Sequence, residues 1–139
     1  MSTSLQTYIG FADGACHSTW NIYSIAWVIY SPSYELVSIH GVSLGQTTNN
    51  IAKYSAVIEL LSESISFGIQ SLIVRLDFEL IVLQLNIVYA IRNPILLRLF
   101  LRFHLLEWEF DYIEYQHIPR YLNTLADAVS SQMLNRHLQ

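Results

Sequence analysis

The chain has 139 residues and a formal net charge of −4, and it is 53% hydrophobic but only 13% charged. This length suits one compact domain with its own core and is short for two domains of ordinary size. One lysine and six arginines are too few for the broad basic surface by which proteins usually hold nucleic-acid phosphates. Affinity for nucleic acid must therefore be local or come from a neighbouring domain.

The apolar excess does not indicate a membrane protein. The longest uninterrupted apolar runs, such as residues 25–30, fall far short of the roughly 18 residues that a spanning helix needs. Residues 1–7 have no basic residue and no apolar core, so no signal peptide is visible, and the single cysteine, Cys16, suits a reducing compartment. We expect an intracellular protein, cytoplasmic or nuclear and not secreted, without membrane contact. An N-terminal tail over residues 1–7 is expected to precede a single domain over residues 8–139.

Three short runs rich in β-branched and aromatic residues open the domain, at residues 8–13, 22–30 and 34–41. Turn-forming stretches separate these runs, so they predict an antiparallel meander of three strands. From Ile51 the apolar residues repeat at intervals of three and four, which predicts an amphipathic helix that ends at Gly68.

A second group of elements follows this helix. Residues 71–76 form a short apolar run that predicts a buried fourth strand. The helix before it acts as a crossover, which places this strand parallel to the first strand. The fourth strand is followed by helices over 78–88 and 95–108, a fifth strand over 110–117 and a terminal helix over 123–137 with Asn123 near its cap. The chain therefore predicts an α/β fold: a five-stranded mixed sheet in the order 3-2-1-4-5 with helices on both faces.

Two carboxylates are expected at one edge of this sheet. Asp13 ends the first predicted strand and Asp77 follows the fourth, and these two strands should be neighbours. In open α/β sheets, ligands gather at the carboxyl ends of parallel strands. Clustered carboxylates repel one another and gain by binding a hard dication such as Mg²⁺. The alternative for each residue is an ordinary turn or cap role, which aspartate often has at a strand end.

Four segments form a specific pattern of sequence and spacing: Phe11-Ala12-Asp13-Gly14-Ala15, Thr48-Asn49-Asn50-Ile51-Ala52-Lys53-Tyr54, Arg75-Leu76-Asp77, and His117-Ile118-Pro119-Arg120 running on to Asn123 and Asp127. Together they resemble the ribonuclease H domain of plant retrotransposon polyproteins, of the gypsy-like, long-terminal-repeat kind. The resemblance implies a ribonuclease H-like fold and an endonuclease that hydrolyses the RNA strand of an RNA/DNA hybrid beside a reverse transcriptase domain. It also implies that Asp13, Asp77 and Asp127 are catalytic and bind Mg²⁺ or Mn²⁺ in a two-metal site.

Lys53 departs from this pattern, because the family carries glutamate at this position near the start of the first helix. A helix N-terminus favours an anion, so a lysine is unexpected there on structural grounds too. We expect its ammonium either to pair with Asp13 or Asp77, in the space of a metal ion, or to point into solvent. Residues 16–20 also replace a glycine-rich turn of the family, and Phe78 stands where serine is common.

A metal ligand is missing whichever way Lys53 points, so we expect impaired cleavage. The alternative function, from a different class, is a catalytically inactive ribonuclease H-like module. Such a module would bind nucleic acid or protein beside a reverse transcriptase.

The resemblance also implies substrate contacts. Thr48, Asn49 and Asn50 match a segment that meets the RNA strand in the minor groove, where 2′-hydroxyls distinguish RNA from DNA. Capping the first helix is their alternative role. His117 and Arg120 match the segment after the last strand, and we expect a structural or substrate-side role for His117 rather than proton transfer.

The helix expected over residues 95–108 is apolar nearly all round, which is typical of a helix buried on more than one side. Two roughly opposite stripes run along it, one through Leu97, Leu101 and Leu105 and the other through Leu99, Phe103 and Leu106. Only one stripe can pack on the sheet, so the other predicts a contact with a partner. We expect a homodimer through this helix across a two-fold axis, with Arg98 and Arg102 flanking the contact.

Overall fold

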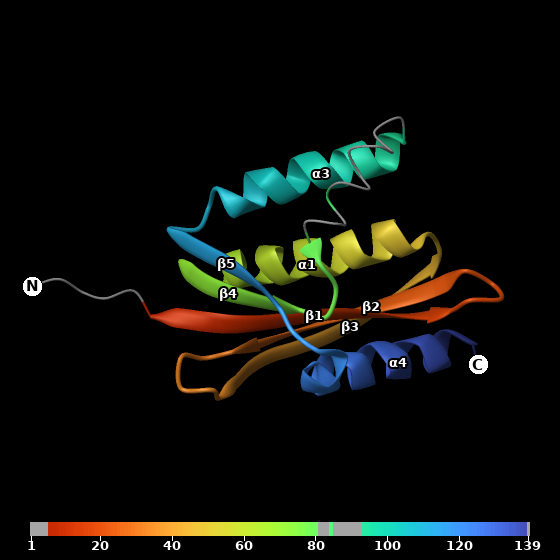
Figure 1. Ribbon diagram of the computed structural model, residues 1–139, viewed down its shortest axis with the longest axis horizontal. Helices are drawn as coiled ribbons and strands as arrows, with labels where there is room; N and C mark the ends of the chain where they lie inside the picture. The colour runs from red at the N-terminus through yellow and green to blue at the C-terminus, as the bar shows by residue number, and fades with distance from the viewer. Residues whose placement is uncertain (1–5, 81–83, 85–92, 139) are drawn as a thin grey trace, which may run out of the picture.

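The computed structural model describes residues 6–80, 84 and 93–138. The elements are, in chain order, β1 (Thr7–His17), β2 (Ile22–Tyr30), β3 (Leu36–Gln46), α1 (Asn49–Ser66), β4 (Ser71–Leu76), α3 (Pro94–Glu107), β5 (Tyr112–His117), the 3₁₀ turn η1 (Arg120–Leu122) and α4 (Thr124–Leu138). α1 and, beyond it, α3 lie on one side of the sheet, and α4 lies on the other (Figure 1). Most of the helix expected over residues 78–88 falls outside the described residues.

The strands follow the order β3-β2-β1-β4-β5, which confirms the order predicted from the sequence. β2 pairs antiparallel with β1 and β3, whereas β4 pairs parallel with β1 and β5. Ala12 is the last residue of β1 that faces β4, where it lies opposite Leu76, and Leu76 lies opposite His117 of β5. The parallel ladders therefore end in one row, and Asp13 and Asp77 directly follow it.

β1 is longer than the sequence predicts. The sequence predicts an end at Asp13 and a turn over residues 14–21, but the strand continues to His17. From Asp13 onward the strand has no partner on β4 and pairs only with β2. Hairpin pairing thus extends a segment whose small residues carry little strand signal of their own. Asp13 lies within β1, at the point where the partner strand β4 stops.

β3 also differs from its predicted bounds. It runs over Leu36–Gln46 instead of residues 34–41. Tyr34 lies in a turn with a φ of 63°, which excludes it from a strand, and pairing with β2 carries β3 further along the chain. Two shifts are smaller: β1 begins at Thr7, the last residue of the expected tail, and β5 begins at Tyr112, slightly later than expected.

Two glycines let helices pack closely on the sheet. A Cβ atom added at Gly10 of β1 would lie 2.7 Å from the side chain of Leu60 on α1, and one added at Gly41 of β3 would lie 2.6 Å from Met133 on α4. These separations are far inside van der Waals contact, so a larger residue at either position would force the facing side chain, or the helix that carries it, to shift. Both helices carry residues of the candidate site, so their depth on the sheet matters for its geometry.

α3 packs on α1 and on β5 through one large aromatic residue. Phe103 is fully buried, and its ring meets Tyr54 of α1 edge-on with the centroids 5.0 Å apart. The ring of Tyr115 on β5 lies 5.9 Å from that of Phe103. Leu99 and Leu106 pack against the same core. None of the helices that the structure describes combines the length and apolar character needed to cross a membrane.

Candidate active site

Three aspartates and a lysine from four separate parts of the fold line one pocket of about 550 Å³. Asp13 comes from β1, Asp77 directly follows β4, and Asp127 lies in the first turn of α4, as predicted. Lys53 enters from the first half of α1, and Arg120 of η1 also lines the pocket. The structure thus brings together the three aspartates and the altered position that the sequence singles out.

Asp13 and Asp77 are neighbours across two parallel strands. Ala12 and Leu76 are the last paired residues of β1 and β4, and each aspartate is the next residue of its own segment. Adjacent strands lie about 4.8 Å apart, and residues at equivalent positions point to the same face. The two carboxylates therefore reach the same side of this edge of the sheet.

The Asp13 carboxyl group is buried and poorly compensated. Its Oδ1 accepts a hydrogen bond from the N–H of Gly14, 2.8 Å away, whereas its buried Oδ2 has no hydrogen-bond partner among the described residues. Burial, followed by the negative charge of Asp77, raises the pKa of Asp13 to about 7; Asp127 adds to the rise, and the Gly14 N–H opposes it. This electrostatic cost is one that a bound cation would relieve.

Asp127 is held by its surroundings at the start of α4. Its backbone N–H donates to the carbonyl of Asn123, 3.1 Å away, and its carboxylate lies 3.7 Å from the exposed guanidinium of Arg120. Asn123 is buried, and its Nδ2 donates to the backbone carbonyl of Ala12 at 3.0 Å. This bond joins the start of α4 to β1 next to Asp13, so it helps to set where Asp127 stands.

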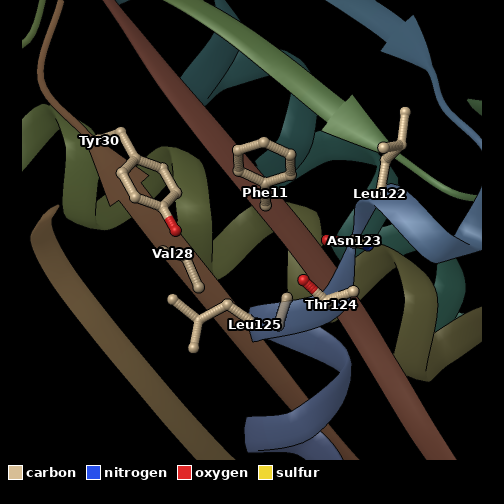
Figure 2. Close-up of a pocket in the computed structure, with 8 residues that line it drawn as sticks. Phe11, Val28, Tyr30, Leu122, Asn123, Thr124 and Leu125 are labelled. Carbon is tan, nitrogen blue, oxygen red and sulfur yellow. The ribbon is translucent and has the colours of Figure 1, made fainter. Parts of the chain in front are cut away.

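The side chain of Asn123 does not act as the helix cap that the sequence predicts. Its Nδ2 bonds to β1, and its Oδ1 has no hydrogen-bond partner among the described residues. Figure 2 shows Asn123 at the start of α4 beside β1, next to a small pocket of about 50 Å³. The other lining residues are mainly apolar: Phe11, Val28, Tyr30, Leu122, Thr124, Leu125 and Ala126. The pocket has room for water but not for a nucleotide. An asparagine before a helix predicts a cap, and only the position of β1 reveals the other bond.

Lys53 neither pairs with an aspartate nor points freely into solvent. It is half-buried, and its Nζ lies over the ring of Phe78, 5.3 Å from the centroid. No ion pair in the described part of the chain involves Lys53, so the expected pairing with Asp13 or Asp77 is wrong. The physical reason is the aromatic ring, whose face attracts a cation. Sequence reasoning noted Lys53 and Phe78 as separate departures and missed their contact.

The pocket offers oxygen ligands that suit a hard divalent cation such as Mg²⁺, but they are not gathered into a finished site. The unpartnered Oδ2 of Asp13 and its repulsion from Asp77 fit such an ion. Asp127 is paired with Arg120 instead. Within residues 6–80, 84 and 93–138, no three His, Cys, Asp or Glu side chains converge closely enough to hold a metal ion. The expected three-aspartate site is therefore not preformed by the side chains as they stand.

The segment before α1 contributes both capping and lining residues. Thr48 is the N-cap of α1, and its Oγ1 accepts a hydrogen bond from the N–H of Ile51 at 3.3 Å. Asn49 is exposed and lines a small pocket of about 70 Å³ together with Asp13. Asn50 is half-buried and lines neither of these pockets. The capping alternative thus holds for Thr48, and Asn49 is the member of this segment that borders the carboxylates.

His117 lies apart from the three aspartates. It is exposed at the end of β5 and lines a different pocket, of about 680 Å³, that contains Glu107 and Tyr115. Phe78 lines both this pocket and the aspartate pocket. The structure therefore brings Arg120, but not His117, together with the aspartates.

A five-stranded sheet in this order, with acids beyond the parallel ladders and at the start of the last helix, defines the ribonuclease H class of fold. The chain belongs to the reverse transcriptase-like family, whose model matches residues 11–133. The matched residues include all three pocket aspartates and Lys53.

The chain is similar to ribonuclease HI of Halobacterium salinarum, with 31% identity over 125 residues, which make up 90% of this chain and 63% of that protein. This chain therefore spans less than two thirds of the length of that relative. The crystal structure of RNase H1 from the same organism has a TM-score of 0.81 at 30% identity, covering 94% of this chain and 98% of that one. LC11-RNase H1, solved in complex with an RNA/DNA hybrid, has a TM-score of 0.80 at 28% identity. The match covers 95% of this chain and 99% of that one.

Proposed function

We propose that this chain is a ribonuclease H domain that hydrolyses the RNA strand of RNA/DNA hybrids endonucleolytically, with cleavage impaired by Lys53. The observation that carries the proposal is the convergence of Asp13, Asp77 and Asp127 on one pocket of a ribonuclease H fold. The similarity to LC11-RNase H1, whose structure holds an RNA/DNA hybrid, supports this choice of substrate.

Asp13 and Asp77 would hold a divalent cation, Mg²⁺ or Mn²⁺, and Asp127 would join them after release from Arg120. A cation bound there supplies a Lewis acid that polarises the scissile phosphate and lowers the pKa of a bound water; in a site with two ions it also stabilises the leaving oxygen. The raised pKa of Asp13 supports this role, because the carboxyl group has few other ways to compensate its charge.

Lys53 would weaken this site in two ways. It supplies no oxygen ligand at a position where the ribonuclease H pattern has glutamate, and it adds a positive charge beside the carboxylates that the metal needs. The contact with Phe78 supports a fixed rather than a mobile position for this charge.

The substrate contacts of the proposal extend from the pocket, which Arg120 lines, to residues outside it. Thr48, Asn49 and Asn50 would meet the RNA strand across the minor groove, where the 2′-hydroxyl identifies RNA. Arg120 would contact a phosphate of the hybrid, and His117 would contact the substrate at the end of β5. The exposure of Asn49, Arg120 and His117 supports access of a large substrate to these side chains.

The proposed context is a retroelement polyprotein of the plant gypsy-like kind, inside the cell, with a reverse transcriptase domain beside this one. The family match, described as reverse transcriptase-like, supports this context. Residues 8–139 would form the whole ribonuclease H domain, after a short tail over residues 1–7.

The test is a cleavage assay on an RNA/DNA hybrid with Mg²⁺ and with Mn²⁺. We expect weak cleavage by the parent, an increase of about 10-fold or more for Lys53→Glu, and loss of that increase when Asp77→Asn is added. Binding of the uncleaved hybrid, measured by fluorescence anisotropy, serves as the control. Robust parental cleavage that survives Asp77→Asn would contradict the assigned site. Hybrid binding without cleavage by any variant would support the inactive module instead.

A further inference from the structure

α3 carries an apolar stripe on its outer side. Leu97, Leu101, Leu105 and Trp108 are 36%, 53%, 68% and 88% exposed. They are spaced at four, four and three residues, so they share one face of the helix. Figure 1 shows α3 as the outermost helix on its side of the sheet, with α1 between it and the strands. This face is separate from the residues of the proposed nuclease site.

The charges beside this stripe have opposite signs in the first half of α3 and in the turn that follows its end. Arg98 and Glu109 are both exposed. At 100° per residue they lie roughly 60° and 80° around the helix from Leu101, in the same direction. Glu109 lies in the turn just past the end of α3, where its N–H donates to the carbonyl of Leu106 at 3.1 Å; Trp108 keeps an αR backbone conformation, so this tightened turn leaves Glu109 close to the same flank. One flank of the stripe is therefore positive in its first half and negative at its end.

We propose that this face binds a second copy of the same chain, with the two α3 helices antiparallel across a two-fold axis. The apolar stripe is centred near Phe103, so Leu101 of one copy lies opposite Leu105 of the other. A two-fold axis between antiparallel helices keeps the same flank of each helix on the same side. In this register Arg98 of one copy falls within about one residue, roughly 1.5 Å along the axis, of Glu109 of the second copy.

The self-complementary charge pattern is the reason to choose a second copy over another partner. The register that buries the apolar stripe also pairs the arginine with the glutamate, and both conditions come from α3 and the turn that directly follows it. Arg102 lies close to the two-fold axis on the same flank, where it approaches Arg102 of the second copy. A single helix pair is smaller than the roughly 1,600 Å² of a standard stable interface. We therefore expect a weak dimer, with a dissociation constant in the micromolar range.

The experiment is a charge exchange followed by sedimentation equilibrium over a dilution series. Arg98→Glu and Glu109→Arg should each raise the dissociation constant about 10-fold, and the double variant should return it to within about threefold of the parent. Arg136→Glu, an exposed arginine at the end of α4, is the matched control and should change nothing. Circular dichroism of each variant checks that the fold is retained.

Arg102 provides a second, opposite test of the same geometry. Arg102→Gln should tighten the dimer severalfold, because it removes the repulsion of two like charges near the axis. Three outcomes would overturn the proposal. The chain could stay monomeric at every concentration, or the double charge exchange could fail to restore association. The chain could also stay monomeric alone but bind an added reverse transcriptase domain through the stripe. The last outcome would assign the stripe to a neighbouring domain.

Discussion

The ammonium of Lys53 lies 5.3 Å from the centroid of the Phe78 ring, at the edge of the pocket that Asp13 and Asp77 line. Both residues depart from the ribonuclease H pattern, both line the pocket of the carboxylates, and they contact each other. A cation over an aromatic face is stabilised by about 0.5–1 kcal/mol at an exposed site and by about 2 kcal/mol when it is desolvated. Phe78 therefore gives the lysine a partner other than Asp13 and Asp77.

A double-mutant cycle should detect this contact directly. We expect Lys53→Met and Phe78→Leu to be coupled by about 0.5–1 kcal/mol in the free energy of unfolding, measured by urea denaturation. The control cycle combines Lys53→Met with Phe67→Leu, because Phe67 is an exposed aromatic residue at the far end of α1. That cycle should be additive. A coupling of zero between Lys53 and Phe78 would show that the ammonium does not use the ring in solution.

Metal affinity should respond to the chemistry of position 53. We expect Lys53→Glu to tighten Mn²⁺ binding about 10–100-fold in isothermal titration calorimetry, because it adds an oxygen ligand and removes a positive charge. Lys53→Gln is the control: it removes the charge but supplies no carboxylate, so its affinity should fall between those of the parent and Lys53→Glu. Equal affinities for the Gln and Glu variants would mean that the charge alone matters and that position 53 contributes no ligand.

Much of the fold follows from the sequence because its signals are local. Runs of β-branched residues, an apolar repeat after Ile51 and the handedness of crossovers together predict the strand order. The same reasoning places Asp13 and Asp77 beside each other. The extension of β1 to His17 depends on pairing with β2, which the small residues of that segment do not signal.

The details of the candidate site depend on contacts between segments that are distant in the sequence, so local sequence patterns do not predict them. Lys53 and Phe78 belong to different elements, and either residue alone suggests only a departure from a family pattern. Asn123 precedes a helix and predicts a cap, yet its amide bonds to Ala12. The pairing of Asp127 with Arg120, which leaves no preformed three-aspartate site, likewise depends on how η1 and α4 sit against the sheet.

Stability without divalent metal should fall as the pH rises from about 4 to about 7, because the pKa of Asp13 is raised from 3.8 to about 7 in the folded protein. Below this window the carboxyl is protonated in both states. Within it the unfolded chain releases the proton while the folded protein keeps it, so unfolding becomes easier as the pH rises. Above about pH 7 this contribution is constant. The loss should be on the order of a few kcal/mol at most.

Urea denaturation in the presence of a chelator, repeated across this pH range, measures the effect. Asp13→Asn serves as the matched variant, because it keeps the shape of the side chain and cannot titrate; its stability should vary less with pH than that of the parent. Excess Mg²⁺ should restore stability to the parent near neutral pH but not to Asp13→Asn. Parallel pH profiles for the two proteins would show that Asp13 has an ordinary pKa in the folded state.

Asn123 should be a positioning residue whose loss affects both stability and the pocket. Asn123→Ala leaves the buried carbonyl of Ala12 without its donor, so we expect a loss of about 1–3 kcal/mol in the free energy of unfolding. Asn123→Asp should cost more, because it also buries a charge. Gln132→Ala, an exposed position on the same helix that does not line the aspartate pocket, is the control and should be nearly neutral. The second measurement is the titration of Asp13 by NMR: if Asn123 holds Asp127 near β1, its removal should lower the pKa of Asp13, because Asp127 contributes to raising it. A destabilised variant with an unchanged Asp13 titration would mean that Asn123 supports the fold without setting the distance between the two carboxylates.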